Sequence, residues 1–120
     1  MTVDPFNERL ARVRQRFMST LEGKISGACA AIRSLQGTTP SVVAAVAETY
    51  RCIHGIVGVG LTVGFPATGR AARSVEDALR AAHSDRRGLT AEEMSRLAQT
   101  LHALRETAAR ELQTFYSILH

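Results

Sequence analysis

Apolar residues recur at three- and four-residue steps along most of this 120-residue chain, the spacing of one buried face of an α-helix. Short segments that contain glycine or proline separate four such stripes. The stripes predict helices over about residues 5–36, 40–63, 66–83 and 91–119. Helices that are each apolar on one face and joined by short connections favour an all-α fold, an antiparallel up-down-up-down four-helix bundle. We expect one such domain over residues 1–120.

The predicted helix ends carry recognisable signals. Asp4 and Pro5 supply an N-cap and a first-turn proline for the first helix, and Gly37 follows its end. Thr90 and Glu93 have the spacing of a capping box, in which each side chain accepts a hydrogen bond from the other's backbone amide. These signals are local, so they support the helix boundaries independently of the apolar stripes.

One segment disagrees with its surroundings. Residues 52–63 are rich in valine, isoleucine and glycine, and by local propensity they favour a strand as readily as a helix. A single strand has nothing to pair with in a chain that is otherwise helical in pattern. We therefore predict that this segment is helical.

The charge is positive, because 15 basic residues outnumber 11 acidic ones, and Lys24 is the only lysine. Such a balance suits nucleic acid or an acidic protein partner. No apolar run reaches about 18 residues and the N-terminus lacks a signal-peptide pattern, so we expect a cytoplasmic protein without membrane association. Cys29 and Cys52 form neither a CxxC pair nor a disulfide framework, and we expect buried free thiols.

A histidine inside the second predicted helix is the strongest candidate for chemistry. His54 lies on the side of this helix away from its apolar stripe, and Gly58 follows one turn later. A glycine inside a helix costs about 0.5–1 kcal/mol relative to alanine, so it needs a compensating reason. Close approach by another molecule to the imidazole is such a reason.

The residues around His54 resemble the signature of the histidine-containing phosphotransfer (HPt) family. That signature reads approximately His-x-Leu-Lys-Gly, with a second glycine six residues further on and an apolar–Glu pair about a dozen residues later. The matching positions here are His54, Ile56, Gly58, Gly64 and Glu76.

The resemblance implies that His54 accepts a phosphoryl group from the aspartate of one receiver domain and passes it to another. The implied partners are response-regulator receiver domains and a hybrid histidine kinase, and the receiver supplies Mg²⁺. We therefore expect no cofactor or metal site in this chain and no enzymatic activity of its own. The chain has no Walker-type or kinase-type nucleotide loop, and its glycines after residue 57 are spaced GxGxxxG without a βαβ unit.

A docking surface is expected around His54. Apolar contact would supply much of its affinity, and cations at its edge would meet phosphate or the acidic rim of a partner. Valine replaces the family's lysine at position 57, so an arginine would have to supply the missing charge. The predicted docking residues are Tyr50, Arg51, Val57, Gly58 and Leu61, with Arg70 and Arg73 as further contacts.

The other histidines, His83, His102 and His120, lack metal-ligand spacing and are expected to be ordinary surface residues. Two alternative functions stay open. One is an HPt-like interaction module that is not phosphorylated, and the other is a basic helical protein that binds nucleic acid. A salt-sensitive affinity for DNA without receiver binding would favour the latter.

Overall fold

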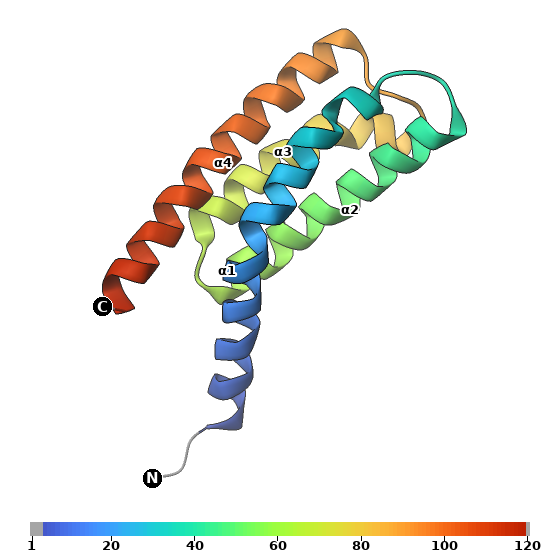
Figure 1. Cartoon of the computed structure of the whole chain (residues 1–120). Helices are drawn as coiled ribbons and strands as arrows, with labels where there is room; N and C mark the ends of the chain where they lie inside the picture. The colour runs from blue at the N-terminus through green and yellow to red at the C-terminus, as the bar shows by residue number, and fades with distance from the viewer. Residues whose placement is uncertain (1–3, 120) are drawn as a thin grey trace.

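The computed structural model describes residues 4–119, and side chains over residues 4–118 (Figure 1). This part of the chain is helical, without strands, and forms a helical bundle. Its elements are α1 (Pro5–Ala31), the short 3-10 helix η1 (Ile32–Leu35), α2 (Pro40–Val63), α3 (Pro66–Ser84) and α4 (Ala91–Leu119). The all-α class is therefore confirmed. Residues 1–3 and His120, which the predicted domain included, lie outside the described residues.

The predicted boundaries agree with these elements except at the end of the first helix. We expected that helix to reach about residue 36, but α1 ends at Ala31 and residues 32–35 tighten into η1. The segment 52–63, which local propensity left ambiguous, is helical as predicted. Burial of its apolar side chains in the bundle outweighs its β-branched composition.

The predicted caps are present. Oδ1 of Asp4 accepts a hydrogen bond from the backbone amide of Phe6 at 3.0 Å. In the capping box, the amide of Glu93 donates to Oγ1 of Thr90 at 3.1 Å, and the amide of Thr90 donates to Glu93 at 2.8 Å. At the end of α2, Gly64 has a φ of +95°, a left-handed conformation that favours glycine.

The N-terminus of α3 is capped from another helix. Phe65 provides no side-chain cap, and the carboxylate of Glu111 on α4 instead accepts from the amides of Ala67 at 3.2 Å and Thr68 at 2.6 Å. This contact joins α4 to the α2–α3 turn. A negative charge at a helix N-terminus is also favoured by the helix dipole.

The core is formed by the inner faces of all four helices together with η1 and the turn residues Phe65 and Leu89. Each fully buried aliphatic or aromatic side chain contributes about 1.5–3 kcal/mol relative to exposure. The largest fully buried side chains are Phe65, Leu21, Leu35, Ile53, Ile56, Leu79, Leu97, Leu101, Leu104, Val46, Val63 and Val75.

The apolar stripe of α1 is only partly buried. Phe6 is 63% exposed and Val13 46% exposed, whereas Phe17 and Leu21 lie in the core. Figure 1 shows that the N-terminal part of α1 projects beyond the other helices, while Leu10 further along still packs against the core. The expected burial of Cys29 and Cys52 is also only partial, although both thiols are free and burial raises the pKa of Cys52.

By length and composition alone, α2 could cross a membrane, even though Glu48 and Arg51 interrupt its apolar sequence. The core helix of a soluble bundle passes the same test. The side chains of Val46, Ile53 and Ile56 on this helix are buried within the bundle.

Close packing between α2 and α3 positions the region around His54. A Cβ atom at Gly60 would lie 3.6 Å from the Cα of Gly69, and one at Gly69 would lie 2.8 Å from Cδ2 of Leu61. These glycines therefore allow the two helix backbones to approach closely at this end of their contact.

Candidate functional site

His54 lies on α2 at the edge of the surface that faces α3. Its neighbours Ile53 and Ile56 are fully buried, and this fixes the rotation of the helix. The histidine side chain is 68% exposed, in agreement with its predicted position away from the core. It is not merely solvated, however, because its Nδ1 lies 2.6 Å from Oε2 of Glu76 on α3.

Glu76 is a buried carboxylate that contacts the exposed histidine. Only 8% of its side chain is accessible, and its second oxygen, Oε1, accepts from the guanidinium of Arg80 at 3.1 Å. An ionised carboxylate only accepts hydrogen bonds, so Nδ1 of His54 carries the hydrogen. In the neutral ring the lone pair is then on Nε2, the nitrogen that Glu76 does not contact.

Two aromatic rings extend the site along α2 and α3. The ring of Tyr50 stacks on that of His83 with centroids 4.3 Å apart, and it lies nearly parallel to the ring of His54 at 6.1 Å. Tyr50 is partly buried. The expectation that His83 is an ordinary surface residue is wrong, because its ring is partly buried against Tyr50.

The surface beside His54 is bare. A Cβ atom added at Gly58 or at Gly55 would have no neighbouring heavy atom within 4 Å, and both residues are exposed. Internal packing therefore does not require glycine at either position. The helix carries the propensity cost of both glycines without an intramolecular reason.

The prediction that Val57 belongs to an exposed docking surface is wrong. Val57 is only 5% exposed and packs in the core. At about 100° per residue it lies about 60° from His54 around the helix, on the side that faces the interior. A lysine at this position would have to bury its stem and bring its ammonium back to the surface.

Leu61 and the predicted arginines are exposed. Leu61 keeps 45% of its surface accessible, and Arg51, Arg70 and Arg73 form no ion pair with the other described residues. The contacts of His54 with Glu76 and of Leu61 with the backbone at residue 69 hold α2 beside α3. Arg70 and Arg73 therefore lie along α3 between these two contacts, and Arg51 is exposed on α2 three residues before His54.

Sequence reasoning did not predict the contact between His54 and Glu76, although it noted the glutamate as part of the family pattern. The apolar stripe gave no such signal, because the burial of Glu76 is seen only in the structure. The predicted inward positions of the third helix are Ala71, Val75, Ala78, Leu79 and Ala82. The involvement of Arg80, four residues after Glu76 on the same helix, was also missed. A buried carboxylate requires donors, and the i,i+4 arginine is the nearest candidate.

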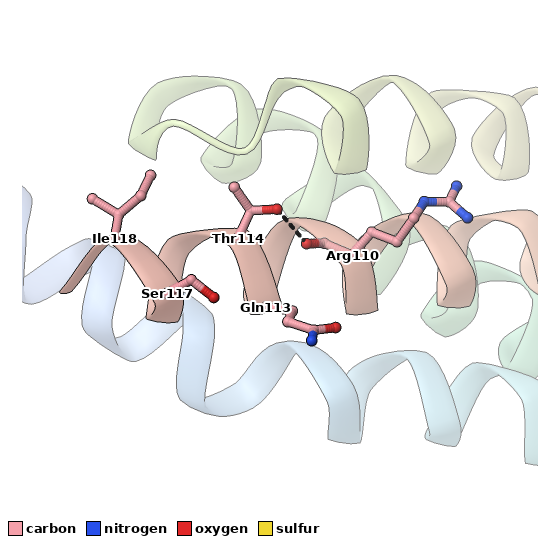
Figure 2. Close-up of a pocket in the computed structure, with 5 residues that line it drawn as sticks. All are labelled: Arg110, Gln113, Thr114, Ser117 and Ile118. Carbon is pink, nitrogen blue, oxygen red and sulfur yellow. Dashed lines mark hydrogen bonds between the residues drawn. The ribbon is translucent and has the colours of Figure 1, made fainter. Parts of the chain in front are cut away.

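Other surface features lie away from His54. Figure 2 shows a shallow depression whose lining comes entirely from the C-terminal part of α4, with a hydrogen bond of 2.9 Å from Oγ1 of Thr114 to the carbonyl oxygen of Arg110. None of the predicted site residues lies there. The residues that line it are Arg110, Gln113, Thr114, Ser117 and Ile118.

Among residues 4–119, no group of three histidine, cysteine or acidic side chains is arranged to hold a metal ion. Comparisons with known proteins add no relative, because no family model matches the sequence and no curated protein or solved structure matches it significantly. The functional argument therefore depends on the residues and their geometry.

Proposed function

We propose that this protein is a histidine phosphotransfer protein and that His54 is its phosphoacceptor. One observation carries the proposal. Nδ1 of an exposed histidine donates to a buried carboxylate at 2.6 Å, which leaves Nε2 available beside a glycine whose side-chain position is open space. This arrangement presents a nucleophile of defined tautomer to an approaching protein.

The proposed step is an exchange of one bond for another. The lone pair of Nε2 attacks the phosphorus of an aspartyl phosphate, and the bond from phosphorus to the aspartate oxygen breaks with its electron pair on the leaving carboxylate. The imidazole, now substituted at Nε2 and still protonated at Nδ1, becomes cationic. Glu76 stabilises that charge through the existing hydrogen bond, and onward transfer to a second aspartate reverses the step.

The proposed partners are receiver domains and a hybrid histidine kinase, and the receiver brings the Mg²⁺ and the groups that catalyse transfer. The docking surface would consist of the exposed side of α2 around Gly55, Gly58 and Leu61, with Arg70 and Arg73 of α3 at its edge. This location agrees with the net positive charge of the chain, since the aspartate pocket of a receiver is acidic. A cytoplasmic location is part of the same proposal.

We further propose the antiparallel up-down-up-down topology for the bundle. Contacts that pair early residues of one helix with late residues of the next support it. Examples are Arg14 with the carbonyl oxygen of Val63, at 2.7 Å, and the amide of Thr68 with Glu111, at 2.6 Å.

Docking without phosphorylation is the second candidate function. The observation that favours it is the buried Val57, which stands where the HPt family has lysine. The chain therefore has no lysine beside the imidazole of His54. In the phosphotransfer proposal, Arg51 or Arg70 supplies the missing positive charge instead.

The test is incubation of the protein with a panel of phosphorylated receiver domains. We expect the wild type to acquire a phosphoramidate that is stable to base and labile to acid, and His54→Gln to acquire none. The matched control is His102→Gln, which changes an exposed histidine on α4. Equal labelling of His54→Gln and the wild type would overturn the assignment of His54, and receiver binding without labelling would favour the docking module.

A further inference from the structure

Arg80 is the second residue that donates to the carboxylate of Glu76. Its guanidinium donates to Oε1 of Glu76 at 3.1 Å, while Nδ1 of His54 lies 2.6 Å from Oε2 of the same carboxylate. Each oxygen of Glu76 therefore has one donor. Arg80 does not contact the imidazole and acts on it only through the glutamate.

The buried carboxylate needs this cation. A carboxylate removed from water is strongly destabilised unless it is paired and hydrogen-bonded. His54 alone offers a neutral donor whenever its imidazole is unprotonated, which is the form required for nucleophilic attack. Arg80 is then the only positive charge in contact with Glu76 among the described residues.

The guanidinium of Arg80 also pairs with a second carboxylate. NH1 of Arg80 lies 2.7 Å from Oδ1 of Asp77. Tyr50 and, next, the charge of Asp77 raise the pKa of Arg80. The ring of Tyr50 is in turn packed on His83. Glu76 and Asp77 of the same helix therefore hold the guanidinium of Arg80, whose side chain is 56% exposed.

We propose that Arg80 is a positioning residue that holds Oε1 of Glu76 and thereby keeps Oε2 in place to accept a hydrogen bond from Nδ1 of His54. Without the guanidinium, Oε1 loses its donor and the carboxylate can turn away from the imidazole. A neutral imidazole whose Nδ1 has lost its acceptor can carry its hydrogen on Nε2 instead, where the hydrogen occupies the nucleophilic lone pair. The consequence for phosphoryl transfer rests on the proposed function, but the effect on the tautomer does not.

The experiment compares Arg80→Gln, Arg80→Lys and Arg73→Gln in the full-length protein. Arg73 is the matched control, an exposed arginine on the same helix without an ion pair among the described residues. The first readout is the ¹⁵N chemical shifts of the His54 ring nitrogens at pH 8, which report the tautomer. The second is the rate of phosphoryl acceptance from an active receiver, and thermal melting checks that each variant is folded.

We expect Arg80→Gln to convert the single Nδ1–H form into a mixture and to slow acceptance about tenfold, the lower end of the loss found when a group that orients a metal-bound histidine is removed. Arg80→Lys should keep most of the Nδ1–H form and most of the acceptance rate. Arg73→Gln should change neither the tautomer of His54 nor the fold. Unchanged ¹⁵N shifts in Arg80→Gln, or a shifted tautomer without slower acceptance, would overturn the proposal. If no receiver labels even the wild type, phosphotransfer itself fails, and the ¹⁵N shifts still decide the role of Arg80.

Discussion

Two regions of the bundle both contain glycines and an arginine-paired glutamate, but these residues have different surroundings in the two regions. The first, called the site face here, is the exposed side of α2 that carries His54, Gly55 and Gly58. The second, called the loop end, consists of the connections 36–39 and 85–90 with the start of α4. A Cβ atom at Gly58 would meet nothing within 4 Å, whereas one at Gly88 would lie 2.9 Å from the backbone nitrogen of Gly37.

The glutamates of the two regions, Glu93 and Glu76, differ in where their hydrogen-bond donors lie. Glu93 at the loop end accepts two hydrogen bonds from Arg87, at 2.7 and 3.1 Å, and one from the amide of Thr90. All of these donors come from residues within six positions of Glu93 and hold the turn before α4 together. Glu76 also pairs with an arginine, but its other donor is a histidine that is exposed to solvent. A side chain whose hydrogen bonds are all made within the chain, such as Glu93, indicates a structural role. The His54–Glu76 pair leaves Nε2 of the histidine exposed, and this indicates interaction with another molecule.

The strongest test of this contrast is Gly88→Ala. The added methyl group would clash with the backbone of Gly37 and would lie 3.0 Å from the carbonyl oxygen of Leu35. Backbone atoms that are tied by the hydrogen bond from Leu89 to Leu35, at 2.8 Å, have little freedom to move. We expect a loss of about 3 kcal/mol in the free energy of unfolding, measured by urea denaturation. A variant as stable as Gly55→Ala would contradict the contrast.

The boundary of the site face is tested by Val57→Lys. Because Val57 lies in the core, we expect the buried stem and displaced ammonium to cost about 2 kcal/mol of stability. The matched control is Val59→Lys, at a half-exposed position on the same helix, where a change within about 0.5 kcal/mol is expected. Chemical denaturation of both variants decides the point. Equal stabilities would mean that Val57 belongs to the exposed surface after all.

Gly58 should respond in the opposite direction from Gly88. With open space around it and a helical backbone, Gly58→Ala should raise the free energy of unfolding by up to about 1 kcal/mol. Gly58→Gln should remain folded but bind receiver domains more weakly, because its side chain projects beside His54. Gly23→Gln on α1 is the control, since that glycine is also exposed and without neighbours. Normal receiver affinity in Gly58→Gln would remove the clearance argument.

The smallest expected effect is the pH dependence of the loop end. Hydrogen bonds from Arg87 lower the pKa of Glu93 from 4.5 to about 2. The ionised carboxylate therefore stabilises the fold fully above pH 4.5, and this contribution is lost as the pH falls toward 2. Denaturation curves between pH 6 and about 3 should show a shallower fall in stability for Glu93→Gln than for the wild type. Identical slopes would show that the Arg87–Glu93 pair contributes little.

Much of the fold was predictable because its signals are local. The caps at Asp4 and at Thr90 with Glu93 lie within a few residues of the backbone groups they bind, and the apolar stripes repeat with the helix itself. The prediction failed where a residue's environment depends on what lies alongside it. Phe6 and Val13 continue the apolar stripe of α1 but stay 63% and 46% exposed, although Leu10 between them packs against the core.

The candidate site was predictable only in part. His54 and Gly58 were recognisable from their spacing, and both are exposed as expected. Val57 was assigned to the same surface because it occupies the position of the family's lysine, although the rotation of α2 turns it inward. The hydrogen bond between His54 and Glu76 could not be predicted, because the two residues are 22 positions apart on different helices.

By itself, the sequence determined that the chain forms four helices with these approximate limits and that one histidine stands on a helix surface beside a glycine. Helical periodicity and capping act over three or four residues, so they can be read without knowledge of neighbouring elements. Only the tertiary structure decided that Glu76 contacts His54, that Arg80 supports Glu76 and that Val57 is buried. Those facts depend on the mutual rotation and distance of α2 and α3, which are set by side-chain packing along the whole length of both helices.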